Sequence, residues 1–332
     1  MFANQNIMHT MNLFTVAALG FMTIGLSYFG VLEYSKWAVR ENILDIPNER
    51  SSHTEPVPRG GGLVIVILTL GGLLLYQILG CCGSWKAVLG FMAGAGLISG
   101  VSWVDDLHSL PVGLRFSAHG LAAIFGIASC GYWHTVSFPL IGQIHLGLLG
   151  LPLTFFWIVG LTNAYNFMDG IDGIAGGQAM CAGLWWSVFG WLYQQPLLLV
   201  LGLFLACSSM GFLAHNWPPA RIFMGDVGSA FLGYSFAMLP IMANYSLSPE
   251  GGWAGSFLAG ILITWPFLLD TTFTFLRRLY NGEDVFRAHR SHIYQRLVIA
   301  GYSSGLISLL YMGLNIMGGI MAVLWSMPEV NP

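Results

Sequence analysis

The chain has 332 residues, of which 8% are charged and 55% are hydrophobic, and its mean hydropathy is +0.69. A soluble domain would be about a quarter charged, so this composition excludes an ordinary water-soluble protein. The formal net charge of −3 gives no sign of a nucleic-acid partner.

Apolar runs long enough to cross a hydrocarbon core of about 30 Å recur along the whole chain. They predict an all-α fold, a polytopic integral membrane protein with about ten transmembrane helices in a single domain, 1–332. Segment 135–147 is too short and too polar to span a bilayer, and we expect a small hairpin there. The predicted spans are 12–34, 61–80, 86–104, 117–134, 148–165, 178–193, 196–214, 228–246, 254–276 and 298–326.

Alternation of these spans places five loops on one face of the membrane. Eleven of the twelve Lys and Arg residues fall on that face, and Lys86 is the exception. Because basic residues in short loops mark the cytoplasmic side, we expect these loops in the cytoplasm and both termini outside. The five loops are 35–60, 105–116, 166–177, 215–227 and 277–297.

Acidic side chains stand at the ends of several predicted spans. Asp105 and Asp106 end the third span, where the negative end of the helix dipole opposes them, so a compensating group such as a cation is expected. Asn166, Asp169 and Asp172 follow the fifth span at intervals of three. This spacing would place the three side chains on one side of a helical turn.

A fifth aspartate, Asp226, follows Gly225 just before the eighth span, where a plain helix N-cap is an equally simple interpretation. Five carboxylates on one face raise one another's pKa unless a cation neutralises them. Mg²⁺ takes one or two carboxylates together with water and substrate phosphates. It therefore suits this set of Asp and Asn better than zinc, and Mn²⁺ is its candidate substitute.

The first and last of these loops carry candidate anion-binding groups. His289 and His292 lie among five arginines in the last loop and could donate hydrogen bonds to phosphate or sugar oxygens. Arg59 precedes three glycines whose backbone N–H groups could cradle an anion, although helix packing explains the glycines equally well. Asp270, inside the ninth span, is either a functional residue by its position or the partner of a polar neighbour.

The chain carries four motifs in this order: Asp105-Asp106, Asn166 to Gly177, Phe223-Met224-Gly225-Asp226 and the His289/His292 loop. Together they resemble those of the polyprenyl-phosphate N-acetylhexosamine-1-phosphate transferase family, in the family's order and over essentially the whole chain. The segments DIPNERSSH, VPRGGG and AHRSHIYQRL are most similar to the subgroup that starts O-antigen or other surface-polysaccharide chains. Other branches carry a triple-histidine or His-x-His-His run where this chain has His289-Arg290-Ser291-His292, which leaves the sugar open and argues against the peptidoglycan branch.

The resemblance implies individual roles. Asp226, with Asn166 nearby, would hold Mg²⁺ on the diphosphate of a UDP-sugar, and Asp105 and Asp106 would serve the lipid phosphate. The other residues implied in substrate binding are Asp172 and Phe223 near the uridine, His289 and His292 at the sugar phosphate, Asn216 upstream of the metal aspartate, and Asp169 in support of the metal ligands. Arg59 joins them as the candidate from the first loop.

The expected reaction is attack by an undecaprenyl-phosphate oxygen on the β-phosphorus of a UDP-N-acetylhexosamine, with release of UMP, at the cytoplasmic face of a bacterial inner membrane. Direct attack, with Asp105 or Asp106 as base, is preferred over double displacement through an aspartyl intermediate, and both routes stay open. The oligomeric state, for which a homodimer is one candidate, stays open as well.

Two other classes of protein, a transporter and an intramembrane protease, fit the sequence less well. A transporter of a sugar nucleotide or a lipid-linked sugar would place key acids near mid-bilayer in repeated halves, whereas here only Asp270 is deep and the halves show no symmetry. An intramembrane aspartyl protease would need a Tyr-Asp pair, which the chain lacks.

Overall fold

The computed structural model describes residues 13–47, 55–80, 84–247, 254–284 and 290–327. Within these ranges ten helices of 17 to 28 residues follow one another in the order of the ten predicted spans. They are α2 (Leu13–Arg40), α3 (Gly62–Ile78), α4 (Trp85–His108), α5 (Val112–Cys130), α6 (Gly150–Phe167), α7 (Ile174–Leu192), α8 (Pro196–Asn216), α9 (Asp226–Leu247), α10 (Ser256–Tyr280) and α12 (Ser304–Ser326).

Eight of these helices, counted among the described residues, are long and apolar enough to cross a membrane, as expected for a polytopic all-α membrane protein. The other two are α3, which is apolar but has 17 residues, and α7, in which glycine, tryptophan and Gln178 interrupt the aliphatic side chains. α7 packs against α8 and α12. Protein therefore surrounds much of α7, which accounts for its lower hydropathy.

Short strands and one short helix complete the described structure. Strands β3 (Thr135–Phe138) and β4 (Gly142–His145) pair in antiparallel fashion, which confirms the predicted hairpin. A 3-10 turn, Gly147–Leu149, leads from the hairpin into α6. Strands β1 (Leu44–Asp45) and β2 (Val57–Pro58) form a second small antiparallel pair, and α11 (Ile293–Ile299) precedes α12.

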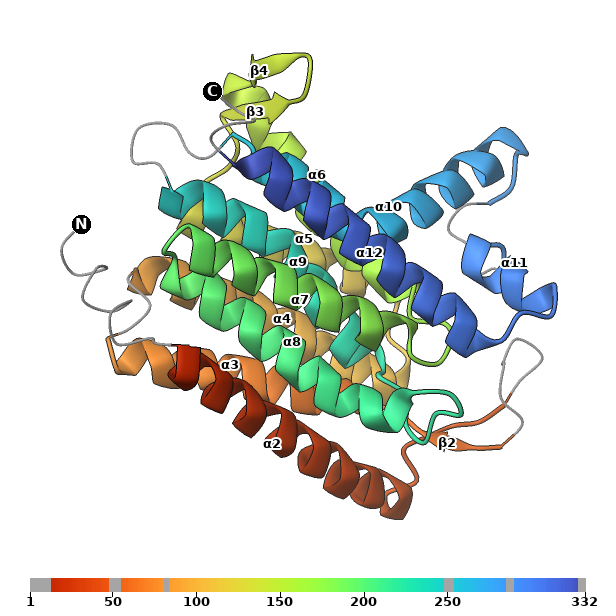
Figure 1. Ribbon diagram of the computed structural model, residues 1–332. Coiled ribbons are helices and arrows are strands. Elements are labelled where there is room, and N and C mark those ends of the chain that lie inside the picture. Colours follow the sequence, from red (N-terminus) through yellow and green to blue (C-terminus); the bar gives the residue numbers. More distant parts are fainter. Residues whose placement is uncertain (1–12, 48–54, 81–83, 248–253, 285–289, 328–332) are drawn as a thin grey trace.

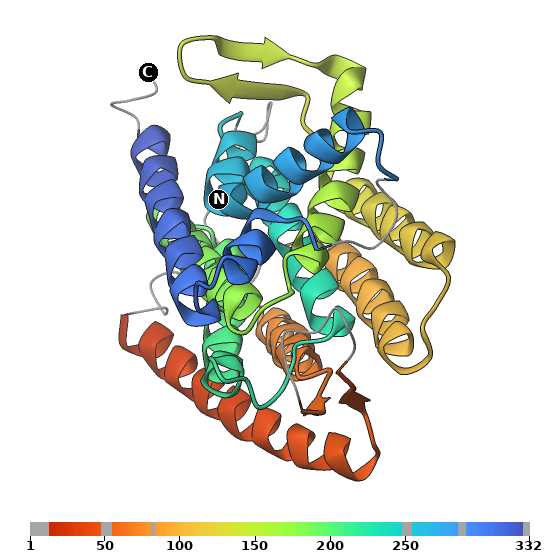
Figure 2. The ribbon, with the colours of Figure 1, turned by 90° about the vertical axis from the view of Figure 1, so that its right-hand side faces the viewer.

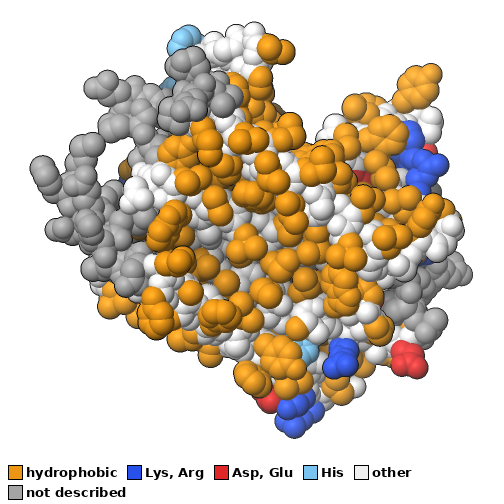
Figure 3. Space-filling view, in the orientation of Figure 1, with side chains coloured by type: hydrophobic (Ala, Val, Ile, Leu, Met, Phe, Trp, Pro, Cys, Tyr) orange, Lys and Arg blue, Asp and Glu red, His pale blue; other side chains and the backbone are white. Residues whose placement is uncertain are grey.

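The helices alternate in direction, so the five predicted loops meet at one end of the bundle. Figure 1 shows β2 and α11 at that end, and β3 and β4 at the opposite end. The described Lys and Arg residues lie at the first end, apart from Lys86; Arg50 and Arg287 lie outside the described residues. Figure 3 shows a largely hydrophobic lateral face with charged side chains gathered toward the same end.

α9 occupies the centre of the bundle (Figure 2), where it packs against α3, α4, α6 and α10 and buries nearly all of its side chains. Close approach to α3 requires glycine, because a Cβ on Gly228 would lie 2.6 Å from the Cα of Gly62. Small residues allow such approaches between membrane helices. The first residue of α9 is therefore held at the middle of the loop-bearing end.

The last part of α10 leaves the bundle. Pro266 lies inside this helix, and a proline removes one helical hydrogen bond and favours a bend. Figure 1 shows the following part of α10 projecting away from the other helices, above α11. Leu269, Phe273 and Leu276 are exposed there, as expected of a helix whose neighbour is lipid.

Candidate active site

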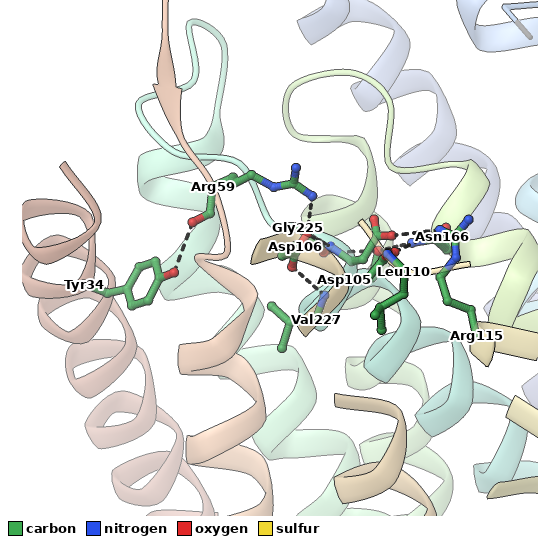
Figure 4. Close-up of polar contacts among 11 residues, drawn as sticks. Tyr34, Arg59, Asp105, Asp106, Leu110, Arg115, Asn166, Gly225 and Val227 are labelled. Carbon is green, nitrogen blue, oxygen red and sulfur yellow. Dashed lines mark hydrogen bonds and ion pairs between the residues drawn. The ribbon is translucent and has the colours of Figure 1, made fainter. Parts of the chain in front are cut away.

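The acids predicted from the sequence meet at the loop-bearing end of the bundle. α4 ends close to Asp105 and Asp106, α9 begins with Asp226, and Asn166 lies in the last turn of α6. Figure 4 shows Asp106, from α4, directed toward Arg59 and Val227, with Asp105 of the same helix and Asn166 of α6 nearby. The C-terminal end of α4 thus meets the N-terminal end of α9.

Asp106 binds the start of α9. Its Oδ1 accepts a hydrogen bond from the backbone N–H of Asp226 at 3.0 Å, and its Oδ2 accepts one from Val227 N–H, also at 3.0 Å. Arg59 donates a further hydrogen bond to Oδ1. The positive end of the α9 dipole and one arginine therefore compensate the unfavourable place of this carboxylate at the end of α4. The sequence predicts a compensating group there and offers a cation as an example; in the structure protein groups take this part.

Glycine is required just before α9. Gly225 has φ +76°, and a Cβ there would lie 2.6 Å from Asp106 Oδ2 and 2.9 Å from the Cα of Gly60. A larger residue would meet both backbone strain and the carboxylate. The Gly-Asp pair is thus explained by close packing as well as by chemistry.

Asp105 is paired with Arg115, at the start of α5. One Arg115 nitrogen, Nη1, lies 3.0 Å from Asp105 Oδ2 and 3.5 Å from Asp226 Oδ2, so the guanidinium bridges acids from two helices. Leu110 N–H also donates to Asp105. In the sequence, Arg115 served only as evidence for topology, and its place in the site was missed. Its position shortly after Asp105 and Asp106, across the turn between α4 and α5, could have indicated that place.

The turn after Arg59 is occupied by protein. The N–H groups of Gly61 and Gly62 donate to the carbonyl oxygens of Phe223 and Met224, each at 2.9 Å. The anion-cradle interpretation is therefore wrong for these two N–H groups, and the packing interpretation holds. The Arg59 side chain itself is 30% exposed, and although burial lowers its pKa, the adjacent Asp106 raises it overall.

Asn166, Asp169 and Asp172 do not share one helical face, contrary to the prediction. α6 ends at Phe167 and α7 begins at Ile174, so both aspartates lie in the loop between them. Gly173 has φ +79°, and Tyr294 packs so closely on Gly170 that a Cβ there would lie 2.0 Å from its hydroxyl oxygen. Both positions in the loop therefore require glycine.

Asp172 and Asn216 hold this loop to the segment that precedes α9. Asp172 Oδ2 accepts a hydrogen bond from Ala220 N–H at 3.0 Å. Asn216 is 4% exposed and joins two backbones, since Oδ1 accepts from Gly173 N–H at 3.0 Å and Nδ2 donates to the Ile222 carbonyl at 2.9 Å. In this structure both side chains position loops. Their contact with substrate stays a prediction.

Phe223 lies in the same segment and is half-buried. Its N–H donates to the Pro58 carbonyl at 2.8 Å, and its own carbonyl accepts from Gly61. These bonds fix the backbone of Phe223 next to the turn that carries Arg59. A role near the uridine is not tested by these contacts and stays a prediction.

Negative charge is in excess within the local cluster, where Asp105, Asp106, Asp169 and Asp226 lie near two arginines, Arg59 and Arg115. The pKa of Asp169 is raised to about 8, first by burial and then by the charges of Asp226 and Asp106. Asp226 is the most accessible of the acids at the helix ends: its side chain is 31% exposed, against 8% for Asp105 and 0% for Asp106. A cation would therefore reach Asp226 first.

The donor set fits Mg²⁺ and does not resemble a closed protein cage. The described residues contain no group of three or more His, Cys, Asp or Glu placed to hold a metal ion. Asp226 and Asn166 offer oxygen donors at the accessible end of the cluster, and Asn166 Nδ2 donates to Ser229 Oγ at 2.9 Å. Mg²⁺ is commonly held by one or two carboxylates, with water and phosphate oxygens completing its shell, as this site would require.

His292 lies at the N-terminal end of α11 and is 4% exposed. Its Nδ1 is 3.1 Å from Oδ1 of Asp270. Asp270 is therefore the partner of polar groups, one of the two interpretations that the sequence left open. His289, the other predicted histidine, lies outside the described residues.

Comparison with known sequences defines the class of protein. Residues 88–244 match glycosyl transferase family 4. The chain belongs to this family, that of the polyprenyl-phosphate N-acetylhexosamine-1-phosphate transferases, as its motifs indicated.

Individual relatives support the assignment. The chain is 33% identical to a probable undecaprenyl-phosphate N-acetylglucosaminyl 1-phosphate transferase of Bacillus subtilis (strain 168), over 80% of this chain and 72% of that protein. It is 29% identical to the decaprenyl-phosphate N-acetylglucosaminephosphotransferase of Mycobacterium tuberculosis (strain H37Rv), over 94% and 83%. It is 27% identical to a phospho-N-acetylmuramoyl-pentapeptide-transferase of Lactiplantibacillus plantarum, over 72% and 64%.

Proposed function

We propose that this protein transfers an N-acetylhexosamine 1-phosphate from a UDP-sugar to undecaprenyl phosphate and releases UMP. The product, a lipid diphosphate sugar, would start an O-antigen or another surface polysaccharide. The names of the relatives support a polyprenyl-phosphate acceptor and an N-acetylhexosamine donor. The segments DIPNERSSH and AHRSHIYQRL are the sequence features that favour surface polysaccharide.

One observation carries this proposal: acids from α4, α9 and the α6–α7 loop meet two arginines at one end of a membrane-spanning bundle. A soluble nucleotide sugar and a lipid phosphate can meet only at such a surface. The excess of Lys and Arg at this end favours the cytoplasmic side of a bacterial inner membrane. The active site would therefore face the cytoplasm.

The side chains divide into two groups by charge. Asp226 and Asn166 would hold Mg²⁺, which supplies charge neutralisation on the diphosphate. Arg59 and Arg115 are 30% and 34% exposed, so their guanidinium groups are accessible to phosphate oxygens, which arginine binds well. Positioning and charge stabilisation of this kind provide most of the catalysis in phosphoryl transfer.

The two adjacent aspartates differ in what they can do. Asp106 is buried and has both oxygens committed to α9 and Arg59, so its part in catalysis is to place Asp226. Asp105 also bonds protein groups, Leu110 N–H and Arg115, but its side chain is 8% exposed against 0% for Asp106, and it faces Arg115 and Asp226. We therefore assign contact with the lipid phosphate to Asp105, in a direct attack without a covalent intermediate.

The decisive experiment measures UMP release. Purified full-length protein is incubated with undecaprenyl phosphate, Mg²⁺ and a panel of UDP-N-acetylhexosamines. UMP is expected from at least one donor, and only when the lipid is present. If no donor gives UMP, the proposed function is wrong.

Asp226→Asn is the matched variant for this assay. It should abolish turnover and leave a folded protein in the membrane, because asparagine keeps the size of the side chain and the ion pair that it weakens, with Arg115, is 3.5 Å long and partly exposed. Near-normal UMP release would remove Asp226 from the metal site.

Two further measurements separate the alternatives. A labelled sugar phosphate trapped on the protein without lipid would show the double-displacement route. Uptake of a sugar nucleotide into proteoliposomes without UMP release would support a transporter. No observation favours the transporter, because Asp270, the one acid predicted deep in a span, is bonded to residues at the N-terminal end of α11.

A further inference from the structure

Asp270, in α10, collects hydrogen-bond donors from two other segments of the chain. Its Oδ1 accepts from Ile293 N–H at 2.8 Å and from the ring of His292 at 3.1 Å. Its Oδ2 accepts from the Tyr311 hydroxyl at 2.7 Å and from Tyr294 N–H at 3.1 Å. A carboxylate that is 1% exposed thus joins α10 to α11 and to α12.

The same cluster reaches the loop that carries Asp169. The Tyr294 hydroxyl donates to the carbonyl of Phe167 at 3.1 Å, and its ring packs on Gly170. The rings of His292 and Tyr294 are stacked, with centroids 5.7 Å apart. His292 therefore belongs to a group of packed and hydrogen-bonded side chains that contacts the loop of Asp169 from the α11 side.

We propose that Asp270 is a positioning residue for the transfer reaction, and that it acts by holding the imidazole of His292 in one orientation. The proposal rests on the proposed function. An Asp that accepts the Nδ1–H of a histidine sets both the tautomer and the ring direction, as carboxylates do behind many active-site histidines. Nε2 is then the ring nitrogen left for the contact with the sugar phosphate that the family resemblance implies for His292.

The backbone bonds of Asp270 make this arrangement stiff. Asp270 binds His292 together with the next two residues, Ile293 and Tyr294, so the ring and the start of α11 cannot shift separately. Displacement of a reacting or binding group by about 1 Å can cost about 100-fold in rate. We therefore expect Asp270→Asn to lower kcat by about 30- to 100-fold, with KM for the nucleotide sugar changed less than about threefold.

A purely structural role would also lower activity, so the test needs a second variant. The amide nitrogen of an asparagine at position 292 can take the place of Nδ1 and donate to Asp270, but the shorter side chain has no counterpart of Nε2. His292→Asn should therefore keep the melting temperature of the wild type and lose about 30- to 100-fold in kcat. Tyr311→Phe removes another donor to Asp270 but leaves the bond between Asp270 and His292. This variant should stay within about threefold of wild-type kcat.

The experiment is a double-mutant cycle on the full-length protein, read by UMP release and by thermal unfolding. If Asp270 acts through His292, Asp270→Asn should cost less than about threefold in kcat when His292→Asn is already present. The same fold-loss in both backgrounds would overturn the proposal. If Asp270→Asn does not fold, Asp270→Glu, which displaces the carboxylate by one methylene, replaces it in the cycle with the same criterion. A wild-type protein that releases no UMP would instead overturn the proposed function.

Discussion

Replacement of Asp106 by asparagine should destabilise the protein through the start of α9. An amide at this position can accept from one of the two N–H groups of α9, and it turns its own NH₂ toward the other. The unsatisfied N–H costs about 1–3 kcal/mol, and the remaining bonds lose the part that comes from charge. With the attraction to the partly exposed Arg59 counted at no more than about 1 kcal/mol, the total loss is about 3 kcal/mol.

This loss is measurable as a shift in the melting temperature of the detergent-solubilised protein. For a chain of this size about 3 kcal/mol corresponds to a decrease of about 4 °C. Asp226→Asn is the matched control: it removes a charge from the same cluster without removing an acceptor of the α9 N–H groups, so it should not lower the melting temperature. A melting temperature for Asp106→Asn within about 1 °C of the wild type would refute the capping role.

Three other predictions concern the same end of the bundle. Gly225→Ala should cost about 3 kcal/mol by thermal unfolding, since a Cβ there meets Asp106; Gly282→Ala, also at positive φ but with open space around it, should cost only about 1 kcal/mol. Arg115→Gln should lower the rate of UMP release by about 100-fold, and a wild-type rate would remove Arg115 from the site. The pKa of Asp169 is about 8 in the folded protein and about 4 when unfolded. Folding thus favours its protonated form, and the stability from this group is full below about pH 4 and lost as pH rises through about 8. In chelator, Asp169→Asn should remove this part of the pH dependence of the melting temperature between pH 5 and 8; an unchanged dependence would contradict the raised pKa.

The helices could be predicted from the sequence because hydropathy is a local property. The ten apolar runs correspond in order to the ten long helices, and the polar segment 135–147 forms the predicted hairpin. The collection of acids and arginines at one end followed from alternation alone. Each of these inferences needed only the composition of a segment and its place in the order.

The contacts within the site depend on how separate helices pack, which spacing along the chain does not reveal. The regular interval of Asn166, Asp169 and Asp172 suggests a helix, but α6 ends at Phe167, and the loop that follows packs through Gly170 on Tyr294, more than a hundred residues away. Asp270 remained without a role for the same reason. Its partners in α11 and α12 are defined only once three helices are in place.

The bond between Asp106 and the start of α9 also bears on how the protein is assembled. The two partners are 120 residues apart, which at about 5–20 residues per second separates their synthesis by about 6–24 s. During that interval α4 enters the membrane with its two terminal carboxylates and without the helix that later caps them. Arg59 and Arg115 flank α4 in the sequence, so they can neutralise the acids first. The two arginines are thus suited to neutralise these acids while the membrane protein is still incomplete, before the proposed active site has formed.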